Sequence, residues 1–113
     1  MIKVVIKFTK KTYKSGREKF IYNDISIKGH SSDGTLNSLK CCAGVTAITS
    51  GIIHLVDLSL CCIELNKGYF HISVHHFDDE LNYALHTLVY QLVNVATIYP
   101  EFFNDIDFIE GEN

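Results

Sequence analysis

The sequence predicts a single α+β domain spanning residues 1-113, in which two helices pack on a mostly antiparallel sheet in the order β-β-α-β-β-α-β. Three observations support this fold class. The 113 residues suffice for one hydrophobic core and leave no room for a second. Segments of alternating hydrophobicity, typical of half-buried strands, occur in pairs separated by turn residues. A longer apolar segment with the length of a helix follows each pair.

The first pair of segments predicts a hairpin. Apolar and polar residues alternate from Ile2 to Thr9, which is the period of a half-buried strand. Ser15-Gly16 is a turn signal, and a β-rich segment runs from Phe20 to Lys28. We therefore expect two antiparallel strands joined over residues 10–19.

A loop and a helix follow the hairpin. Gly29 to Asn37 contains turn-forming residues instead of a hydrophobic period and predicts a flexible surface loop. Leu39 to Val56 is apolar on all sides, so we expect a central, buried helix. The side chain of Asn37 or Ser38 is expected to cap it by accepting a hydrogen bond from an amide of the first turn.

The second half predicts another hairpin. Leu58 to Leu65 is an almost wholly apolar strand, Asn66-Lys67-Gly68 is a turn, and Tyr69 to His75 alternates again. A second amphipathic helix starts near Asp78 and ends before Pro100, with an apolar stripe of Leu81, Leu85, Leu88, Leu92 and Val95. Asp105 to Ile109 predicts a last short strand.

Charge and composition exclude several classes of protein. Thirteen acidic and ten basic residues give a net charge of −3, so we expect no direct nucleic-acid partner. A cluster of basic residues near the N-terminus keeps an RNA-binding module as the least favoured class, using Tyr13, Phe20 and Tyr22 beside the lysines. The cluster contains Lys3, Lys7, Lys10, Lys11, Lys14, Arg17 and Lys19.

The sequence also predicts a cytoplasmic protein without a membrane partner. Lys3 and Lys7 interrupt the apolar segment that a secretory signal needs. The longest uncharged run, Cys41 to Val56, is shorter than a membrane-spanning helix of roughly 20 residues and contains several polar residues. Four cysteines in a reducing compartment are expected as thiols rather than disulfides.

One loop histidine and two adjacent cysteines suggest thiol chemistry. His30 lies in the predicted loop, and Cys41 and Cys42 lie near the start of the predicted helix. Helix N-terminal amides stabilise a thiolate, and a nearby imidazole can take the thiol proton. The same amides are expected to hold an oxyanion, and the protonated imidazole can donate to a leaving amine. The pattern suits a cysteine hydrolase, but a cysteine near a helix start is more often a buried packing residue, and a loop histidine is more often simply exposed.

This stretch resembles the ribosomal-processing cysteine protease (Prp) family. The family pattern is Gly-His, a Gly-containing loop, then Cys-Ala-Ala/Gly-x-Ser-Ala at a helix start, and the residues that fit it are Gly29-His30, Gly34 and Cys42-Ala-Gly-Val-Thr-Ala. The spacing of twelve residues from His30 to Cys42 also agrees. Gly68-Tyr-Phe-His-Ile and residues 78–99 resemble the second half of the family.

The resemblance implies a function and a set of site residues. It implies a cysteine endopeptidase that removes a short N-terminal extension from a large-subunit ribosomal protein during ribosome assembly, as a homodimer and without a cofactor. By position, His30 is the general base and Cys42 the nucleophile, while Thr46 takes the place of the family's Ser. Gly29 and Gly34 are expected to let the loop move His30 when peptide binds.

Two departures from the family pattern leave alternatives open. Cys41 stands where the family usually has Val, so a register shifted by one residue makes Cys41 the nucleophile. Leu39 stands where the family commonly has Asp, three residues before its Cys. Ser38 can replace that Asp only as a cap, and Asp33 is a candidate substitute for its charge. A catalytically inactive module that binds a ribosomal protein or an assembly partner is therefore the second hypothesis.

The remaining cysteines and histidines are expected to be structural. Cys41-Cys42 and Cys61-Cys62 lack the two-residue spacer of common zinc sites, so we expect no metal. Cys61 and Cys62 are expected to fill the core as small hydrophobes. His71 and His75 are expected to be exposed on a strand, and His54 and His86 to be hydrogen-bonded helix residues.

Overall fold

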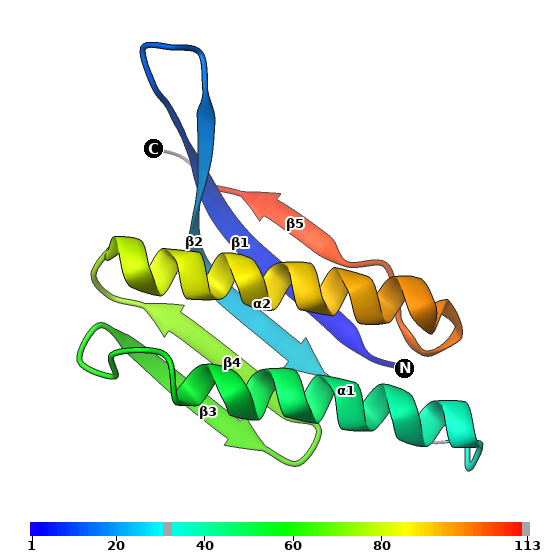
Figure 1. Cartoon of the computed structure of the whole chain (residues 1–113). Coiled ribbons are helices and arrows are strands. Elements are labelled where there is room, and N and C mark those ends of the chain that lie inside the picture. The colour runs from blue at the N-terminus through cyan, green and yellow to red at the C-terminus, as the bar shows by residue number, and fades with distance from the viewer. Residues whose placement is uncertain (31–32, 112–113) are drawn as a thin grey trace.

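The computed structural model describes residues 1–30 and 33–111, and it has two helices on one face of a five-stranded sheet (Figure 1). The predicted fold class and order of elements are confirmed. In chain order the elements are β1 (Lys3–Thr12), β2 (Glu18–Lys28), α1 (Leu36–Ile53), β3 (Cys61–Asn66), β4 (Tyr69–Val74), α2 (Asp79–Ile98), a 3-10 turn η1 (Pro100–Phe102) and β5 (Asp107–Glu110).

The strands lie in the spatial order β3-β4-β2-β1-β5. Three neighbouring pairs are antiparallel, and only β1 and β5 run parallel. The two edges of the sheet are therefore β3 and β5. Ile25 pairs with both Ile6 and Ile72, which places β2 at the centre of the sheet.

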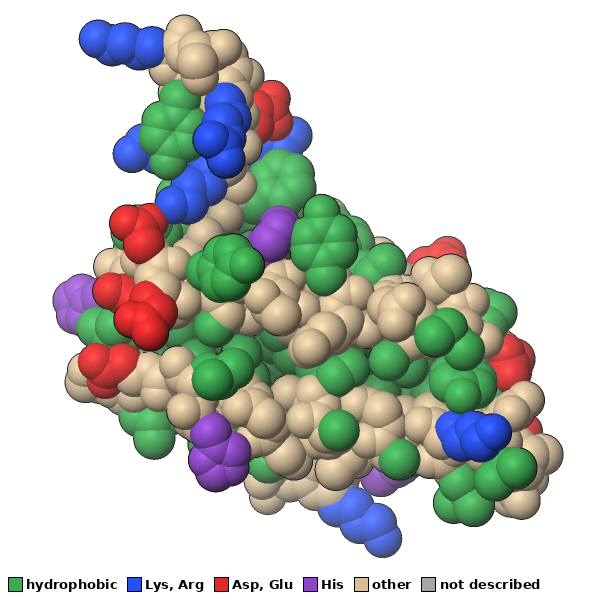
Figure 2. All heavy atoms as spheres, in the orientation of Figure 1, with side chains coloured by type: hydrophobic (Ala, Val, Ile, Leu, Met, Phe, Trp, Pro, Cys, Tyr) green, Lys and Arg blue, Asp and Glu red, His purple; other side chains and the backbone are tan. Residues whose placement is uncertain are grey.

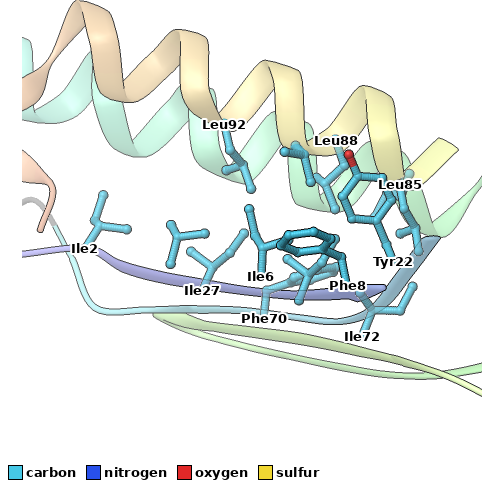
Figure 3. Close-up of a cluster of buried hydrophobic side chains, with 14 of the residues drawn as sticks. Ile2, Ile6, Phe8, Tyr22, Ile27, Phe70, Ile72, Leu85, Leu88 and Leu92 are labelled. Carbon is cyan, nitrogen blue, oxygen red and sulfur yellow. The ribbon is translucent and has the colours of Figure 1, made fainter. Parts of the chain in front are cut away.

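The core lies between the sheet and α2, as Figure 3 shows. Because side chains alternate along a strand, every second residue of β1 faces the helices. Val4 and Ile6 are fully buried there, and they pack in one cluster with Leu85, Leu88 and Leu92 of α2. The predicted leucine stripe of α2 is confirmed as the face that closes the core.

Helix α1 begins three residues earlier than the sequence predicted. Its N-cap is Thr35, whose Oγ1 accepts a hydrogen bond from the Ser38 amide at 3.2 Å. Asp33 fixes this cap, because its carboxylate accepts hydrogen bonds from both the amide and the hydroxyl of Thr35. The prediction that Asn37 or Ser38 caps the helix is wrong, since both lie inside its first turn.

Helix α1 is also less buried than predicted. Only Ser38, Cys41, Thr49 and Ile52 are buried along its length. It lies beside α2 on the β3 side of the layer, so its outer side has no neighbour within the described chain (Figure 1). With a mean hydropathy of 1.3 over 18 residues it is also apolar and long enough to cross a membrane, although it packs here against α2.

The second hairpin starts three residues later than predicted. The Asp57 carboxylate accepts hydrogen bonds from the amide and hydroxyl of Ser59, and the Asp57 carbonyl accepts one from the Leu60 amide. This local turn takes the backbone groups that a strand would need, so β3 begins only at Cys61. Cys61 is buried as predicted, but Cys62 is exposed, because neighbouring residues of a strand face opposite sides.

Candidate functional site

A pocket of about 500 Å³ lies between α1, the end of β2 and the β3–β4 turn. The residues of α1 that line it lie on one face of the helix and include Cys42, Thr46 and Thr49. Residues 65–70 line it as well, together with Gly29 and His30. The structure thus brings four predicted site residues together, namely Gly29, His30, Cys42 and Thr46. Gly34 and Ser38 do not line the pocket.

Hydrogen bonds hold the backbone at Gly29 and at His30. The Gly29 amide donates a hydrogen bond to the Gly68 carbonyl at 2.9 Å, and the N-terminal ammonium group of Met1 donates one to the His30 carbonyl at 3.0 Å. Gly29 has a φ of +103°, and a Cβ there would overlap the Met1 carbonyl oxygen. Only glycine therefore fits at position 29, where the chain turns out of β2.

The His30 ring packs against the β3–β4 turn. A Cβ on Gly68 would overlap Nε2 and Cε1 of the ring, so the glycine leaves the space that the imidazole occupies. Gly68 also has a φ of +71°, which the two-residue turn requires. The sequence marked residues 66–68 as a turn but gave them no role in the site. The available signal was the Gly68-Tyr-Phe stretch. No local pattern, however, reveals that this stretch contacts His30.

The two adjacent cysteines point in different directions. Cys41 has no exposed surface and belongs to the hydrophobic core, while Cys42 is half-buried and lines the pocket. Successive residues on a helix are rotated by about 100°, so only one of the pair can face the pocket. This geometry favours Cys42 over Cys41 as the residue that meets a ligand.

Three solved structures share the fold of this chain over nearly their whole length. The ribosomal processing protease Prp from S. aureus, in complex with a covalently linked product peptide, matches with a TM-score of 0.71 and 25% identity over 96% of this chain and 99% of that chain. The fold is that of Prp. The resemblance expected from the Gly-His and Cys-Ala-Gly motifs is confirmed by this structural match.

Two further structures agree with this match. Prp from S. aureus with a substrate peptide has a TM-score of 0.69 and 23% identity, covering 96% of this chain and 99% of that chain. A protein from Streptococcus mutans has a TM-score of 0.71 and 17% identity, covering 98% of this chain and 96% of that chain. No protein-family model and no curated protein matches this sequence.

The helix start changes one expectation drawn from the place of Cys41 and Cys42 in the predicted helix. Cys42 is the seventh residue of α1, so it lies in the second turn rather than at the N-terminus. The amides that a helix leaves without a helical partner are those of its first residues, and Ser38 already donates its amide to Thr35. These groups lie about 6 Å along the axis from the Cys42 amide. The predicted use of helix N-terminal amides at Cys42 is therefore not supported.

The position of the Prp family's Asp is occupied by an exposed side chain. Leu39 is 66% exposed and lies three residues before Cys42 on the helix surface. Asp33, the proposed substitute, is engaged by Thr35, whose side-chain and backbone hydrogen bonds lower the pKa of Asp33. These hydrogen bonds of Asp33 thus serve the helix cap rather than His30.

A second pairing of cysteine and histidine lies outside the pocket. His75 Nε2 is 3.1 Å from Cys62 Sγ, and both residues are exposed. His71 Nε2 lies 2.8 Å from Asp24 Oδ2, within hydrogen-bond distance, so His71 is not simply an exposed strand residue as predicted. His54 is exposed at the end of α1. Over residues 1–30 and 33–111, no three side chains of His, Cys, Asp or Glu gather as a metal site.

Proposed function

We propose that this chain is a cysteine endopeptidase that removes a short N-terminal extension from a large-subunit ribosomal protein in the cytoplasm. One observation carries the proposal: His30 from the end of β2 and Cys42 from α1 line the same pocket. The structural match to a Prp protease that holds a peptide product supports a peptidase role. The exposed position of His30 and the half-buried position of Cys42 let a peptide reach both.

The two residues suffice for peptide hydrolysis. His30 takes the proton of the Cys42 thiol, and the sulfur attacks the scissile carbonyl to form a tetrahedral intermediate. The carbon–nitrogen bond then breaks, and the imidazolium of His30 gives its proton to the leaving amine. Water, activated by His30, hydrolyses the thioester and restores the thiol. Thr46, one turn after Cys42, lines the pocket from the same helix face.

The pocket fits a peptide with bulky apolar side chains. Ile2, Ile27, Val45 and Phe70 contribute to its lining, and Lys67 is its only Lys, Arg, Asp or Glu among the described residues. Leu65 and Asn66, also in the lining, end the edge strand β3, whose outer side has no strand partner within residues 1–30 and 33–111. An extended peptide that pairs with this edge would run into the pocket.

Cleavage of a synthetic peptide tests the proposal. The peptide copies the N-terminal extension of the host's large-subunit ribosomal protein, and mass spectrometry measures the products. We expect Cys42→Ala and His30→Ala to abolish cleavage. Cys62→Ala and His75→Ala each remove one member of the other cysteine–histidine pair. They are the matched controls, and we expect both to retain cleavage. Loss of cleavage in Cys62→Ala with retention in Cys42→Ala would place the site elsewhere.

A homodimer is part of the proposal. Leu36, Leu39 and Leu55, in or just after α1, are each at least 65% exposed, and a small domain gains stability by burying such side chains against a second copy. Sedimentation equilibrium of the wild type and Leu36→Glu measures this. A dimer that Leu36→Glu weakens supports the proposal, and a monomeric wild type at high concentration contradicts it.

An inactive binding module is the second candidate, and Leu39 is the observation that favours it. The side chain in the Prp family's Asp position has no charge, and the structure offers no substitute in Asp33, which serves the cap of α1. Peptide that binds tightly to the folded wild type without being cleaved would support this candidate. The same result would contradict the endopeptidase proposal.

A further inference from the structure

The β1–β2 hairpin extends beyond the sheet as an arm, which we define as residues 9–20 (Figure 1). Among the residues that the structure describes, Thr9 to Thr12 of β1 pair only with β2, because β5 pairs no further along β1 than Phe8. The turn at its tip is ordered by hydrogen bonds from the Tyr13 amide to the Arg17 carbonyl and from the Gly16 amide to the Tyr13 carbonyl. The arm is therefore a regular projection with a defined shape.

The arm concentrates positive charge in an otherwise acidic chain. Its five basic residues and one acidic residue give it a formal charge of +4, whereas the other residues, with five basic and twelve acidic, carry −7. Figure 2 shows lysine and arginine side chains gathered on this projection. The net charge of −3, which argued against a nucleic-acid partner, is the sum of two regions of opposite sign.

A cleft of about 660 Å³ lies between the arm and the start of α2. Three exposed aromatic rings line it: Tyr83 is 73% exposed, Phe20 is 40% and Tyr13 is 39%. Arg17 lines it as well. Its two acidic residues are already paired, Asp79 with Lys19 at 2.6 Å and Glu18 with Lys10 at 3.7 Å.

At the base of the cleft, hydrogen bonds of the Asn82 side chain link the first hairpin to α2. The Asn82 side chain accepts a hydrogen bond from the Tyr22 amide and donates one to the Phe20 carbonyl. Asn82 is 6% exposed, so these bonds form away from water. The Tyr22 hydroxyl also lies 2.7 Å from Nδ1 of His86. These hydrogen bonds thus hold the arm, with its aromatic rings and basic side chains, against α2.

We propose that the arm and its cleft bind a single-stranded nucleic acid. Lys11, Lys14 and Arg17 would contact phosphates, and an unpaired base would stack on Tyr83 inside the cleft. The Phe20 ring already has the Lys10 ammonium group 5.6 Å from its centroid and packs against Phe8. Cations that follow a backbone next to aromatic platforms are the features by which proteins hold single strands without sequence preference. A bilayer is locally flat and reaches only the tip of the arm, and an acidic peptide has few planar groups for these rings.

Fluorescence anisotropy tests the proposal directly. The probes are fluorescein-labelled oligouridylate and oligothymidylate of about twelve nucleotides, titrated at several salt concentrations from about 50 to about 200 mM. We expect saturable binding that weakens steeply with salt. If oligouridylate binds more tightly than oligothymidylate, the surface prefers RNA. If the two probes bind equally, the surface accepts single strands of RNA and of DNA. No binding of either probe at the lowest salt overturns the proposal.

Two variants separate phosphate contacts from stacking. Lys14→Ala with Arg17→Ala should lower the slope of log affinity against log salt by about 1.4, since each phosphate contact contributes about 0.7 on a single strand. Lys28→Ala with Lys40→Ala, outside the arm, is the control with equal charge loss. Tyr83→Ala should weaken binding about fivefold or more at unchanged slope.

Two further outcomes decide the proposal. An unchanged affinity in Tyr83→Ala would show a plain polyanion contact and contradict the role of the cleft. Equal slopes in the arm variant and its control would contradict the role of the arm. Cys42→Ala should bind the probes like the wild type, so this test does not depend on whether the chain is a protease.

Discussion

The imidazole of His30 occupies the space that a side chain would fill on Gly68, so a turn 38 residues later in the chain positions the proposed base. The Gly29 amide, which donates to the Gly68 carbonyl, adds a second link between the same two segments. The absence of a side chain at Gly68 is thus a feature of the site as well as of the turn.

Gly68→Ala should abolish peptide cleavage by pushing the His30 ring out of place. The substitution also strains a residue with positive φ, at a cost of about 1 kcal/mol in the free energy of unfolding. Gly16→Ala is the matched control, because Gly16 has a φ of +84° and open space around it. Urea unfolding should show similar losses of stability for both, while only Gly68→Ala loses cleavage. Full cleavage by Gly68→Ala would contradict the placement of His30.

Leu39→Asp should increase the rate of cleavage. Leu39 is exposed and lies one helical turn before Cys42, so a carboxylate there would stand near the pocket without disturbing the core. Asn37→Asp is the control, since Asn37 is exposed in the first turn of the same helix and is not one of the leucines proposed for the dimer. We expect kcat to rise several-fold only for Leu39→Asp. An equal change in both variants would assign the effect to general negative charge on α1.

Thr35→Ala should destabilise the protein by about 1 kcal/mol, which is typical of a lost helix cap. The reason is that Thr35 Oγ1 accepts from the Ser38 amide and also bonds to Asp33. Asn37→Ala, a change at an exposed residue of the first turn, should leave the free energy of unfolding within about 0.5 kcal/mol. Urea denaturation measures both. A larger loss of stability in Asn37→Ala than in Thr35→Ala would instead support the helix cap that the sequence predicted.

Stability should decline above pH 10 in a way that depends on Tyr22. Burial raises the pKa of Tyr22 above its ordinary value of 10.0, and the charge of Tyr90 adds to this. The folded state holds the phenol proton more tightly than the unfolded state, so this contribution is complete below pH 10 and is lost as the pH rises through the folded-state pKa.

Tyr22→Phe should flatten this alkaline decline. At pH 8 it should also cost about 1 kcal/mol, because it removes the hydrogen bond to His86. Tyr83→Phe, at an exposed residue, is the control and should decline with pH as the wild type does. Urea unfolding at several pH values measures all three proteins. Parallel curves for Tyr22→Phe and the wild type would show that Tyr22 does not titrate differently in the two states.

The element order could be predicted because hydrophobic period is a local property of the chain. The alternation in β1 and the leucine stripe of α2 both gave the correct element and the correct buried face. The start of α1 could not be predicted from the same patterns, since Thr35, Asn37 and Ser38 are all good cap residues. Asp33 decides between them by holding Thr35 in place.

The burial of α1 shows a different limit. Its apolar residues surround the helix, so composition predicted a central position, but the place of a helix in a layer depends on its neighbours. Because α1 has α2 on one side only, Leu36 and Leu39 stay exposed. In the same way, the apolar sequence around Cys61 and Cys62 predicted that both are buried, whereas Cys62 is exposed and lies next to His75.

By itself the sequence determined the α+β class, the order of the elements and the candidate residues His30 and Cys42, because motif and period are written along the chain. Only the tertiary structure decided that Cys42 faces the pocket while Cys41 is buried, that Gly68 supports His30, and that the basic residues of the first hairpin project on an arm. These relationships join residues distant in sequence, and packing creates them.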